Sequence, residues 1–228
     1  MDIEKLLIKS NFIDIHTHNE RYLSDVLKII CILSHDVKKT EFKPDMLYSI
    51  GFHPWYLQDD TKGIRRVIKS MENEQIIAIG EVGLDRLTTS SIDKQKEIFI
   101  KQIQIALAFQ KPLIIHCVKA YSDCLELFKS INPSVAVIFH GYNGNSEITE
   151  KLSKWNAYFS FGYQLLNKNE NVSEIFKTIP PDRVFFETDM ADISIVDVYS
   201  KAAELVNKDV ISWIEQIKSN FLNVFKKN

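Results

Sequence analysis

The chain has 228 residues, 45% of them hydrophobic, and a formal net charge of −2, which is typical of one large globular domain. This charge excludes a strong global attraction to nucleic acid, although it is compatible with a local basic patch. No apolar run approaches the ~20 residues of a membrane span, and Met1-Asp2-Ile3-Glu4 is unlike the start of a signal peptide, so we expect no membrane contact. Three cysteines without a Cys-x-x-Cys pair favour a reduced, cytoplasmic protein.

Short apolar runs alternate with longer segments of helical pattern along the chain. Most of the runs are almost continuously apolar, as in parallel strands that are buried on both faces. The predicted strands are 12–16, 28–33, 47–52, 76–81, 113–116, 135–140, 157–162 and 184–188. The predicted helices are 61–72, 93–109, 121–131, 146–154, 171–178, 196–206 and 209–226, with prolines at 112, 180 and 181 marking two of their ends.

Strands that alternate with helices predict a parallel sheet with right-handed crossovers. Eight such units predict that residues 1–228 form a single α/β domain, a (β/α)₈ TIM barrel. An open doubly wound sheet is the structural alternative. The first unit is the weakest, because only about nine residues separate His18 from the second strand. We therefore expect its helix to be short or missing.

Potential metal ligands stand at the ends of five predicted strands. Because a parallel barrel brings all these ends to one mouth, we expect a metal site there. Taken singly, each histidine is more simply a structural residue, and each carboxylate a helix cap or solvated loop residue. The joint pattern favours a site. Its members are His16 and His18 after strand one, Glu81 after strand four, His116 after strand five, His140 after strand six and Asp189 after strand eight.

The types of ligand restrict which metal ions are expected at this site. Imidazole and carboxylate donors suit Zn²⁺, Mn²⁺, Ni²⁺ or Fe, leave Mg²⁺ open, and disfavour a calcium site. Six donors exceed one tetrahedral site, so two ions about 3.5–4 Å apart are expected, with Glu81 able to bridge them. Such a pair would activate a water and polarise a substrate oxygen, which is hydrolytic chemistry.

Six segments and the C-terminal helix resemble, in order, the motifs of the TatD-type metal-dependent hydrolases, deoxyribonuclease-like members of the amidohydrolase barrel superfamily. The segments are Asp14-Ile-His-Thr-His18, Gly51-Phe-His-Pro54, Gly80-Glu-Val-Gly-Leu-Asp85, Leu113-Ile-Ile-His116, Phe139-His140-Gly141 and Glu187-Thr-Asp189, and the helix carries Asn220-Phe-Leu-Asn-Val-Phe225.

The resemblance implies that the six residues at the strand ends bind one or two divalent ions, with three as an upper bound, and that the reaction is 3′-to-5′ removal of nucleotides from DNA. It implies that Asp189 orients or deprotonates the attacking water and that Glu81 bridges the ions. His53 would lie beside the substrate, with capping of the loop before Pro54 as its alternative role. Asp85 would hold the loop after strand four, and Asp14 would orient a ligand.

Some cationic groups of the family pattern are missing. The family usually has an arginine two residues after the strand-five histidine, where this chain has Val118 followed by Lys119. Lys119 is therefore the expected substrate-binding cation, although lysine lacks the bidentate fork of arginine. The basic loop that usually follows the last motif is also absent. Arg21, Arg86 and Lys168 could compensate in part, although a solvated surface position is the simpler interpretation of each. Aromatic residues near the mouth, on which bases could stack, more simply pack the loops; they are Trp55, Tyr56, Tyr142 and Tyr163.

We therefore predict a metal-dependent phosphodiesterase whose partner is DNA. Because cationic groups that could bind a phosphate backbone are missing, an alternative is hydrolysis of a small phosphoester, lactone or amide in the same site. A non-catalytic barrel that serves as a binding or scaffold protein is the third hypothesis. Nothing in the sequence indicates an obligate protein partner, and His35 has no evident role.

Overall fold

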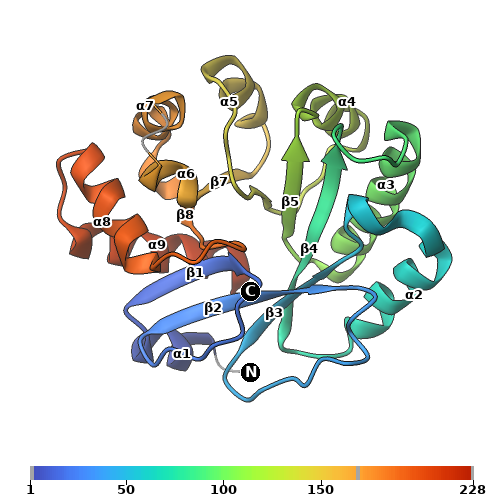
Figure 1. The fold of residues 1–228 in the computed structure, drawn as a ribbon, viewed down its shortest axis with the longest axis horizontal. Helices are drawn as coiled ribbons and strands as arrows, with labels where there is room; N and C mark the ends of the chain where they lie inside the picture. The colour runs from blue at the N-terminus through green and yellow to red at the C-terminus, as the bar shows by residue number, and fades with distance from the viewer. Residues whose placement is uncertain (1–2, 168–169, 227–228) are drawn as a thin grey trace.

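Eight parallel strands form the core of the protein, in a computed structural model that describes residues 3–167 and 170–226. They pair in chain order, each with the next, and curve into a near-closed barrel (Figure 1). All eight predicted strands are confirmed. Their bounds are β1 (Phe12–Thr17), β2 (Val26–Leu33), β3 (Leu47–Gly51), β4 (Ile76–Asp85), β5 (Leu113–Val118), β6 (Val137–Phe139), β7 (Ala157–Phe161) and β8 (Val184–Phe186).

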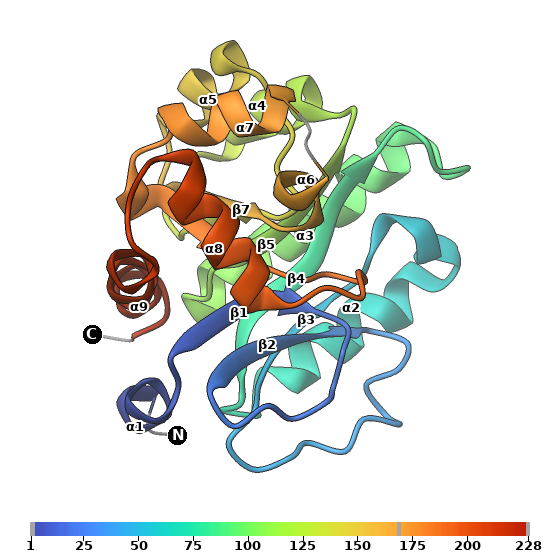
Figure 2. The same ribbon diagram turned by 60° about the vertical axis from the view of Figure 1, so that its left-hand side comes forward.

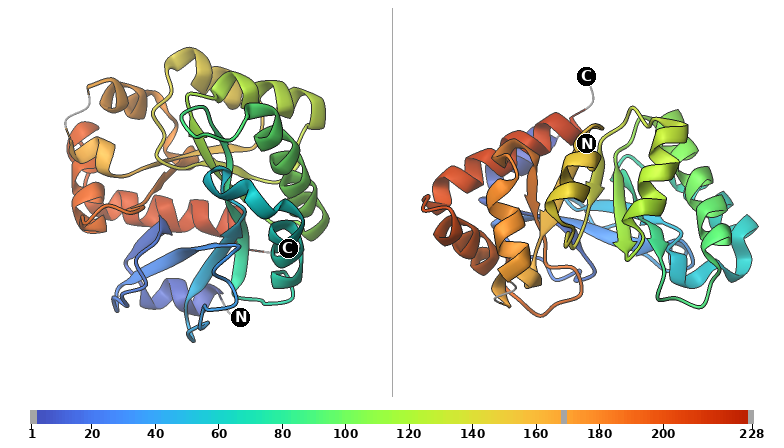
Figure 3. Two further views of the ribbon diagram at one scale, coloured as in Figure 1. Left: turned by 45° about the vertical axis from the view of Figure 1, so that its right-hand side comes forward. Right: turned by 90° about the horizontal axis from the view of Figure 1, so that it is seen from above.

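Helices follow six of the eight strands and lie outside the sheet (Figures 1 and 3). The seven predicted helices correspond to α2 (Asp60–Ser70), α3 (Ile92–Phe109), α4 (Tyr121–Ile131), α5 (Ser146–Leu152), α7 (Glu170–Thr178), α8 (Ile195–Leu205) and α9 (Val210–Phe225). Not predicted were α1 (Ile3–Lys9), α6 (Tyr163–Leu166) and the 3₁₀ helices η1 (Pro54–Asp59) and η2 (Pro181–Arg183). As expected for the first unit, residues 18–25 contain no helix, and neither do residues 34–46.

Local signals in the sequence set the ends of α3, the longest helix. The Ser91 side chain accepts a hydrogen bond from the Lys94 backbone amide, 3.3 Å away, and so caps the first turn. At the other end Gln110 adopts a left-handed backbone with φ 50°, and Pro112 follows before β5 begins. The next strand therefore starts at a defined position relative to α3.

The strands are runs of apolar residues because both faces of the sheet are buried. All ten residues of β4 and all five of β7 are buried. The outward-facing side chains pack under the helices: the Cys117 sulfur on β5 lies 3.5 Å from the Cys124 sulfur on α4. Cys117 thus faces away from the barrel interior, as its place after His116 predicts.

Between β8 and β1 the barrel closes without a regular ladder. The Tyr199 hydroxyl of α8 accepts from the Ile13 amide and donates to the Ile13 carbonyl, each at 3.1 Å. The Asn220 side-chain amide of α9 donates to the Val184 carbonyl at 2.8 Å. Side chains of α8 and α9, which lie beside β1 in Figure 2, therefore satisfy strand groups that a neighbouring strand would otherwise pair.

At the mouth the same seam is closed by backbone bonds. A single parallel bridge joins Thr17 to Asp189. The Asp189 amide donates to the His16 carbonyl at 2.9 Å, and the His18 amide donates to the Asp189 carbonyl at 3.1 Å. Closure of the barrel therefore fixes the backbone of three predicted ligands at once.

The two ends of the described chain lie close together on the side of the molecule away from the mouth (Figures 2 and 3). There Lys226 Nζ is 2.5 Å from Glu4 Oε1. Within residues 3–167 and 170–226, none of the helices has the length and hydropathy to cross a membrane.

We expect Tyr199→Phe to lower the free energy of unfolding by about 1–3 kcal/mol, because it leaves the buried Ile13 amide and carbonyl without partners. Urea denaturation would measure the loss. Tyr22→Phe is the matched control, since Tyr22 is 65% exposed and its change should stay within about 0.5 kcal/mol. Equal stability of the two variants would contradict this role for Tyr199.

Candidate metal centre

All six predicted ligands lie at the mouth of the barrel. Glu81 and His116 belong to β4 and β5, and His16 lies near the end of β1. His18, His140 and Asp189 stand one to three residues beyond β1, β6 and β8. The structure thus brings together side chains that are far apart in the sequence, as the barrel topology predicts.

One half of the cluster is formed by His16, His18, Glu81 and Asp189. Glu81 Oε2 lies 3.5 Å from both His16 Nε2 and His18 Nε2. Asp189 Oδ1 lies 3.5 Å from His16 Nε2 and 3.7 Å from His18 Nε2. A tetrahedral ion with bonds of about 2.1 Å separates its donors by about 3.4 Å, so these spacings match such an ion.

The other half surrounds the second oxygen of Glu81. Glu81 Oε1 lies 2.6 Å from His116 Nδ1, 2.8 Å from His140 Nε2 and 3.1 Å from His53 Nε2. One oxygen of this carboxylate therefore faces His16 and His18, and the other faces His53, His116 and His140. This is the arrangement expected of a bridging carboxylate.

Glu81 is a buried anion, since its side chain is 6% exposed. Burial by itself would raise its pKa, but the imidazoles of His140, His116 and His16 hold the pKa well below its usual range. Burial and His140 would lower the pKa of His16, yet the carboxylates of Asp189 and Glu81 raise it to about 9. The carboxylates of the cluster therefore stabilise a positive charge, either a proton on an imidazole or a cation, in the space between them and the imidazoles.

His16 gives the most direct test of whether a cation fits. The residue is fully buried, and neither ring nitrogen makes a hydrogen bond with any described residue. A buried polar nitrogen without a partner costs about 1–3 kcal/mol. A divalent ion next to His16 Nε2 would give that nitrogen a partner among carboxylate and imidazole donors, so the residues present fit the metal that their chemistry implies.

Two further carboxylates contact candidate ligands at the ring nitrogen that faces away from Glu81. Asp85 Oδ2 lies 3.1 Å from His116 Nε2, which leaves Nδ1 directed at Glu81. Glu187 Oε1 lies 3.4 Å from His140 Nδ1 and accepts a 2.7 Å bond from the Gly141 amide. Hydrogen bonding of the outward nitrogen fixes the orientation of an imidazole whose other nitrogen faces a metal.

Asp85 also performs the expected loop role. Its Oδ1 accepts the Leu87 amide at 2.7 Å, and its Oδ2 accepts the Trp55 indole N–H at 2.6 Å. Asp14, in contrast, bonds the segment that carries Asp189 rather than an imidazole. Its two oxygens accept from the Thr188 amide at 3.0 Å and from the Thr188 hydroxyl at 2.7 Å.

Two motif glycines allow close approach of the strands that carry the site. A Cβ on Gly51 would collide with the backbone of Glu81. Gly83 has φ +141° and lies against the His116 carbonyl, so a side chain there would be both strained and blocked. These contacts explain why glycine recurs in the second and third motifs.

Some expected residues lie differently from the prediction. Tyr142 is fully buried and its hydroxyl lies 2.8 Å from Thr149 Oγ1, so it packs the loop after β6 and offers no ring to a substrate. Arg86 is held by Asp123, with both oxygens of that carboxylate 2.8–2.9 Å from the guanidinium. Lys119 is exposed directly after β5, with a left-handed backbone at φ 50°. Arg21 is exposed, and Lys168 lies outside the described residues.

Other residues are placed as follows. His53 is buried beside Glu81, whereas Trp55 is 48% exposed and its ring centroid lies 6.0 Å from that of His116. Tyr163 is half exposed, at the start of α6. His35 pairs with Asp36 at 3.2 Å, and its ring centroid lies 4.8 Å from that of Tyr56, whose ring in turn lies 5.9 Å from His53.

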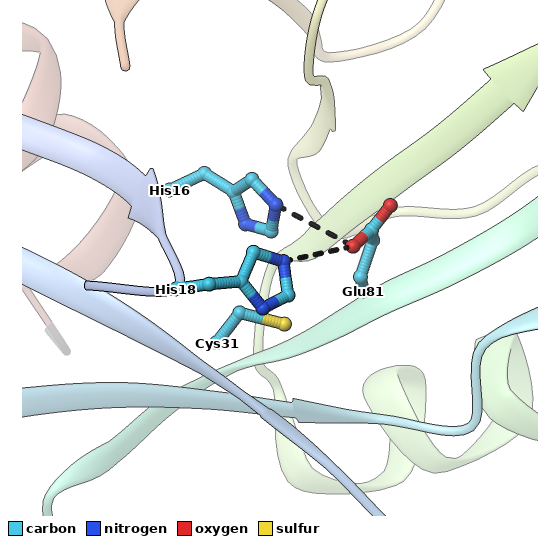
Figure 4. Close-up of side chains that lie close together, drawn as sticks. All are labelled: His16, His18, Cys31 and Glu81. Carbon is cyan, nitrogen blue, oxygen red and sulfur yellow. Dashed lines mark ion pairs between the residues drawn. The ribbon is translucent and has the colours of Figure 1, made fainter. Parts of the chain in front are cut away.

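Cys31 is a neighbour that the sequence analysis missed. Its sulfur lies within 4.8 Å of a donor atom of each of His16, His18 and Glu81 (Figure 4). It lies inside β2 rather than at the strand's end, so the signal that found the other residues could not find it. Alternation along β2 offers the only hint, since it assigns Cys31 to one face.

The model of the TatD related DNase family matches residues 31–226. The chain belongs to this family. The match begins after β1, so the histidines of β1 lie outside it.

Individual relatives agree with this assignment. The Bacillus subtilis protein described as an uncharacterized metal-dependent hydrolase, YabD, is 37% identical over 150 residues, which are 64% of this chain and 59% of the relative. The human 3′-5′ RNA nuclease TATDN2 is 28% identical over 155 residues, 64% of this chain and 20% of the relative. The aligned part of this chain thus spans less than two thirds of the length of both.

A solved structure confirms the fold. The crystal structure of YjjV, a TatD homolog of Escherichia coli K12, superposes with a TM-score of 0.83 and covers 96% of this chain and 99% of that chain, at 16% identity. The predicted barrel fold is therefore confirmed over nearly the whole chain.

We expect Mn²⁺ or Zn²⁺ to raise the melting temperature, because an ion that binds only the folded cluster stabilises it by mass action. At one hundred times Kd the gain is about 2.7 kcal/mol, or about 5–10 °C for a chain of this size. Thermal denaturation with and without a chelator would measure it. Glu81→Gln should lose most of the shift. Glu126→Gln, on the exposed outer side of α4, should keep it, and equal shifts in both variants would contradict the proposed centre.

Proposed function

We propose that this protein is a divalent-metal-dependent hydrolase of phosphodiester bonds that removes nucleotides from the 3′ end of DNA. In this proposal His16, His18, Glu81, His116, His140 and Asp189 hold two divalent ions. The observation that carries it is the division of the Glu81 carboxylate, whose two oxygens face two different sets of imidazoles. Two ions that share one carboxylate suit displacement at a phosphate.

Family membership supports the reaction class. The matching family model is described as a TatD related DNase, and the name of the human relative describes a 3′-5′ RNA nuclease. Both descriptions concern ester bonds of nucleic acids, and both agree with a donor set of imidazoles and carboxylates.

The exposure of the two central carboxylates suggests different roles. Bound divalent ions would lower the pKa of a water and polarise a phosphoryl oxygen. The Glu81 side chain is 6% exposed, so it is shielded from solvent and suited to a fixed bridging position. The Asp189 side chain is 42% exposed at the mouth, where it can orient the attacking water, accept its proton and release that proton to solvent.

The backbone of Asp189 helps to aim this carboxylate. Its φ of 52° is left-handed, a conformation that aspartate tolerates better than most residues. The bonds to His16 and His18 on both sides of its peptide hold it there. The position of the proposed base is therefore set by closure of the barrel.

Groups around the mouth would bind the substrate. His53 lies next to Glu81, and burial lowers its pKa, so it is neutral. Its Nδ1 accepts a hydrogen bond from the Trp55 amide at 3.2 Å and its Nε2 faces Glu81 Oε1, so the ring caps the loop after Pro54 and would line the substrate site without donating to the substrate. Lys119 would contact a phosphate as a point charge. The half-exposed ring of Trp55, close to His116, offers a face on which a base can stack.

The salt bridge of Arg86 with Asp123 favours a second candidate function. Its guanidinium is already engaged by Asp123, so it adds little attraction for a phosphate backbone. With fewer cations at the mouth, a small phosphoester, lactone or amide becomes the alternative substrate for the same centre.

An assay with matched substrates separates the two candidates. Purified protein with MnCl₂ or ZnCl₂ would be incubated with single- and double-stranded DNA, RNA of the same sequence, and bis-p-nitrophenyl phosphate. We expect nucleotides to be released from the 3′ end of DNA. Cleavage of the small diester alone would replace the nuclease proposal with the alternative. No cleavage of any of these substrates would refute the phosphodiesterase proposal, and a further panel of a phosphomonoester, a lactone and an amide, also left intact, would refute the alternative.

We further expect Asp189→Asn to lower kcat at least about 100-fold, because the amide cannot accept the proton of the attacking water. Asp192→Asn makes the same chemical change at an exposed position three residues further along the loop, and should leave kcat within about twofold. Circular dichroism would check that both variants fold. A wild-type rate in Asp189→Asn would remove Asp189 from the mechanism.

A further inference from the structure

The feature that the proposed function leaves unexplained is the thiol of Cys31. Cys31 lies on β2, is 7% exposed, and is free of any disulfide. Its sulfur and one donor atom each of His16, His18 and Glu81 all lie within 4.8 Å of one another. Figure 4 shows the sulfur turned toward the same space as the two imidazoles and the carboxylate.

These distances are within the reach of a single ion. A tetrahedral cation about 2.1 Å from an imidazole nitrogen and about 2.3 Å from a sulfur separates these two donors by about 3.6 Å. Because the donors lie within 4.8 Å of one another, a side-chain shift of at most about 1.2 Å brings the Cys31 sulfur into bonding distance. His16 Nε2, fully buried and without a hydrogen-bond partner among the described residues, is directed into the same space and independently indicates a ligand there.

Other roles for this thiol fit the surroundings less well. The sulfurs of Cys117 and Cys124 pair with each other on the helix side of β5, so they provide no disulfide partner for Cys31. Simple packing would call for apolar neighbours. Instead Cys31 faces imidazoles and a carboxylate, and its register partner on β3 is the buried polar residue Ser49.

We propose that Cys31 is a thiolate ligand of the ion held by His16, His18 and Glu81. This inference rests on the proposed function, since it assumes that the centre binds a divalent ion. On binding, the S–H bond breaks, the proton leaves to solvent, and the electron pair that stays on sulfur is donated to the cation. No electrons are gained or lost, so no oxidant or reductant is required.

A sulfur donor would change which metal the centre prefers. Thiolate is a soft ligand that favours Zn²⁺ and Co²⁺ over Mn²⁺ and Mg²⁺, which prefer oxygen donors. The half of the centre next to β2 would then select zinc, whereas the half around His116 and His140 has, among the residues that the structure describes, only imidazole and carboxylate donors. The two halves would differ in metal preference within one cluster.

Cobalt provides a direct probe of the bond. The full chain, freed of metal with a chelator, would be titrated with CoCl₂ without oxygen and followed by absorption spectroscopy. Visible ligand-field bands report that Co²⁺ is bound, and a near-ultraviolet charge-transfer band reports a sulfur ligand. We expect both in the wild type. Cys31→Ser should lose the charge-transfer band and keep the ligand-field bands, whereas Cys124→Ser, the matched control for a buried thiol, should keep both.

Affinity gives a second measurement. Cys31→Ser should weaken Zn²⁺ binding at least about tenfold and change Mn²⁺ binding by less than about threefold. If the serine variant does not fold, Cys31→Val allows the same comparison with an apolar side chain of similar size.

The outcomes separate this inference from the proposed function. Bound cobalt without a charge-transfer band in the wild type, or a band that persists without Cys31, would overturn the role of Cys31 and leave the metal centre intact. A wild-type protein that binds no Co²⁺ would overturn both.

Discussion

The burial of one carboxylate determines how the mouth of this barrel must be built. An anion as buried as Glu81 is expensive unless it is paired, and it is surrounded by the imidazoles of four strands or the loops after them: His16, His53, His116 and His140. Each of these rings needs its own support, which Asp85 and Glu187 provide for two of them. The polar network therefore extends outward from Glu81, and the loss of any one member leaves a charge or a nitrogen without a partner.

Closure of the barrel and assembly of the site depend on the same residues. The bridge between Thr17 and Asp189 is the one point at which the backbones of the two terminal strand segments pair within the described residues. Below it, Tyr199 and Asn220 satisfy strand groups with side chains. The mouth thus has a fixed backbone where the chemistry needs it, and side-chain contacts where only stability is required.

Sequence alone predicts what local patterns encode. The eight strands are apparent because burial on both faces demands apolar runs, and the candidate ligands because they interrupt the ends of those runs. The helix α6 is missed because four residues carry too little periodicity. The helices α1 and α5 both have seven residues but differ in context: α5 lies between two strands, where the alternation calls for a helix, whereas α1 precedes the first strand. Cys31 and the support given by Glu187 depend on which strands become neighbours, and Tyr142 on how a loop turns back into the core. Those are tertiary facts that no local pattern contains.

The seam between β1 and β8 also has a consequence for the order of events during synthesis. The Asp189 amide bonds to the carbonyl of His16, more than 170 residues earlier in the chain. Contacts of such separation form late, because a long loop must first be closed. On the ribosome, the first two histidines therefore emerge long before Asp189, and Glu81, which also lies beside them, emerges between the two. The ion-binding centre is one of the last parts of the molecule that can form.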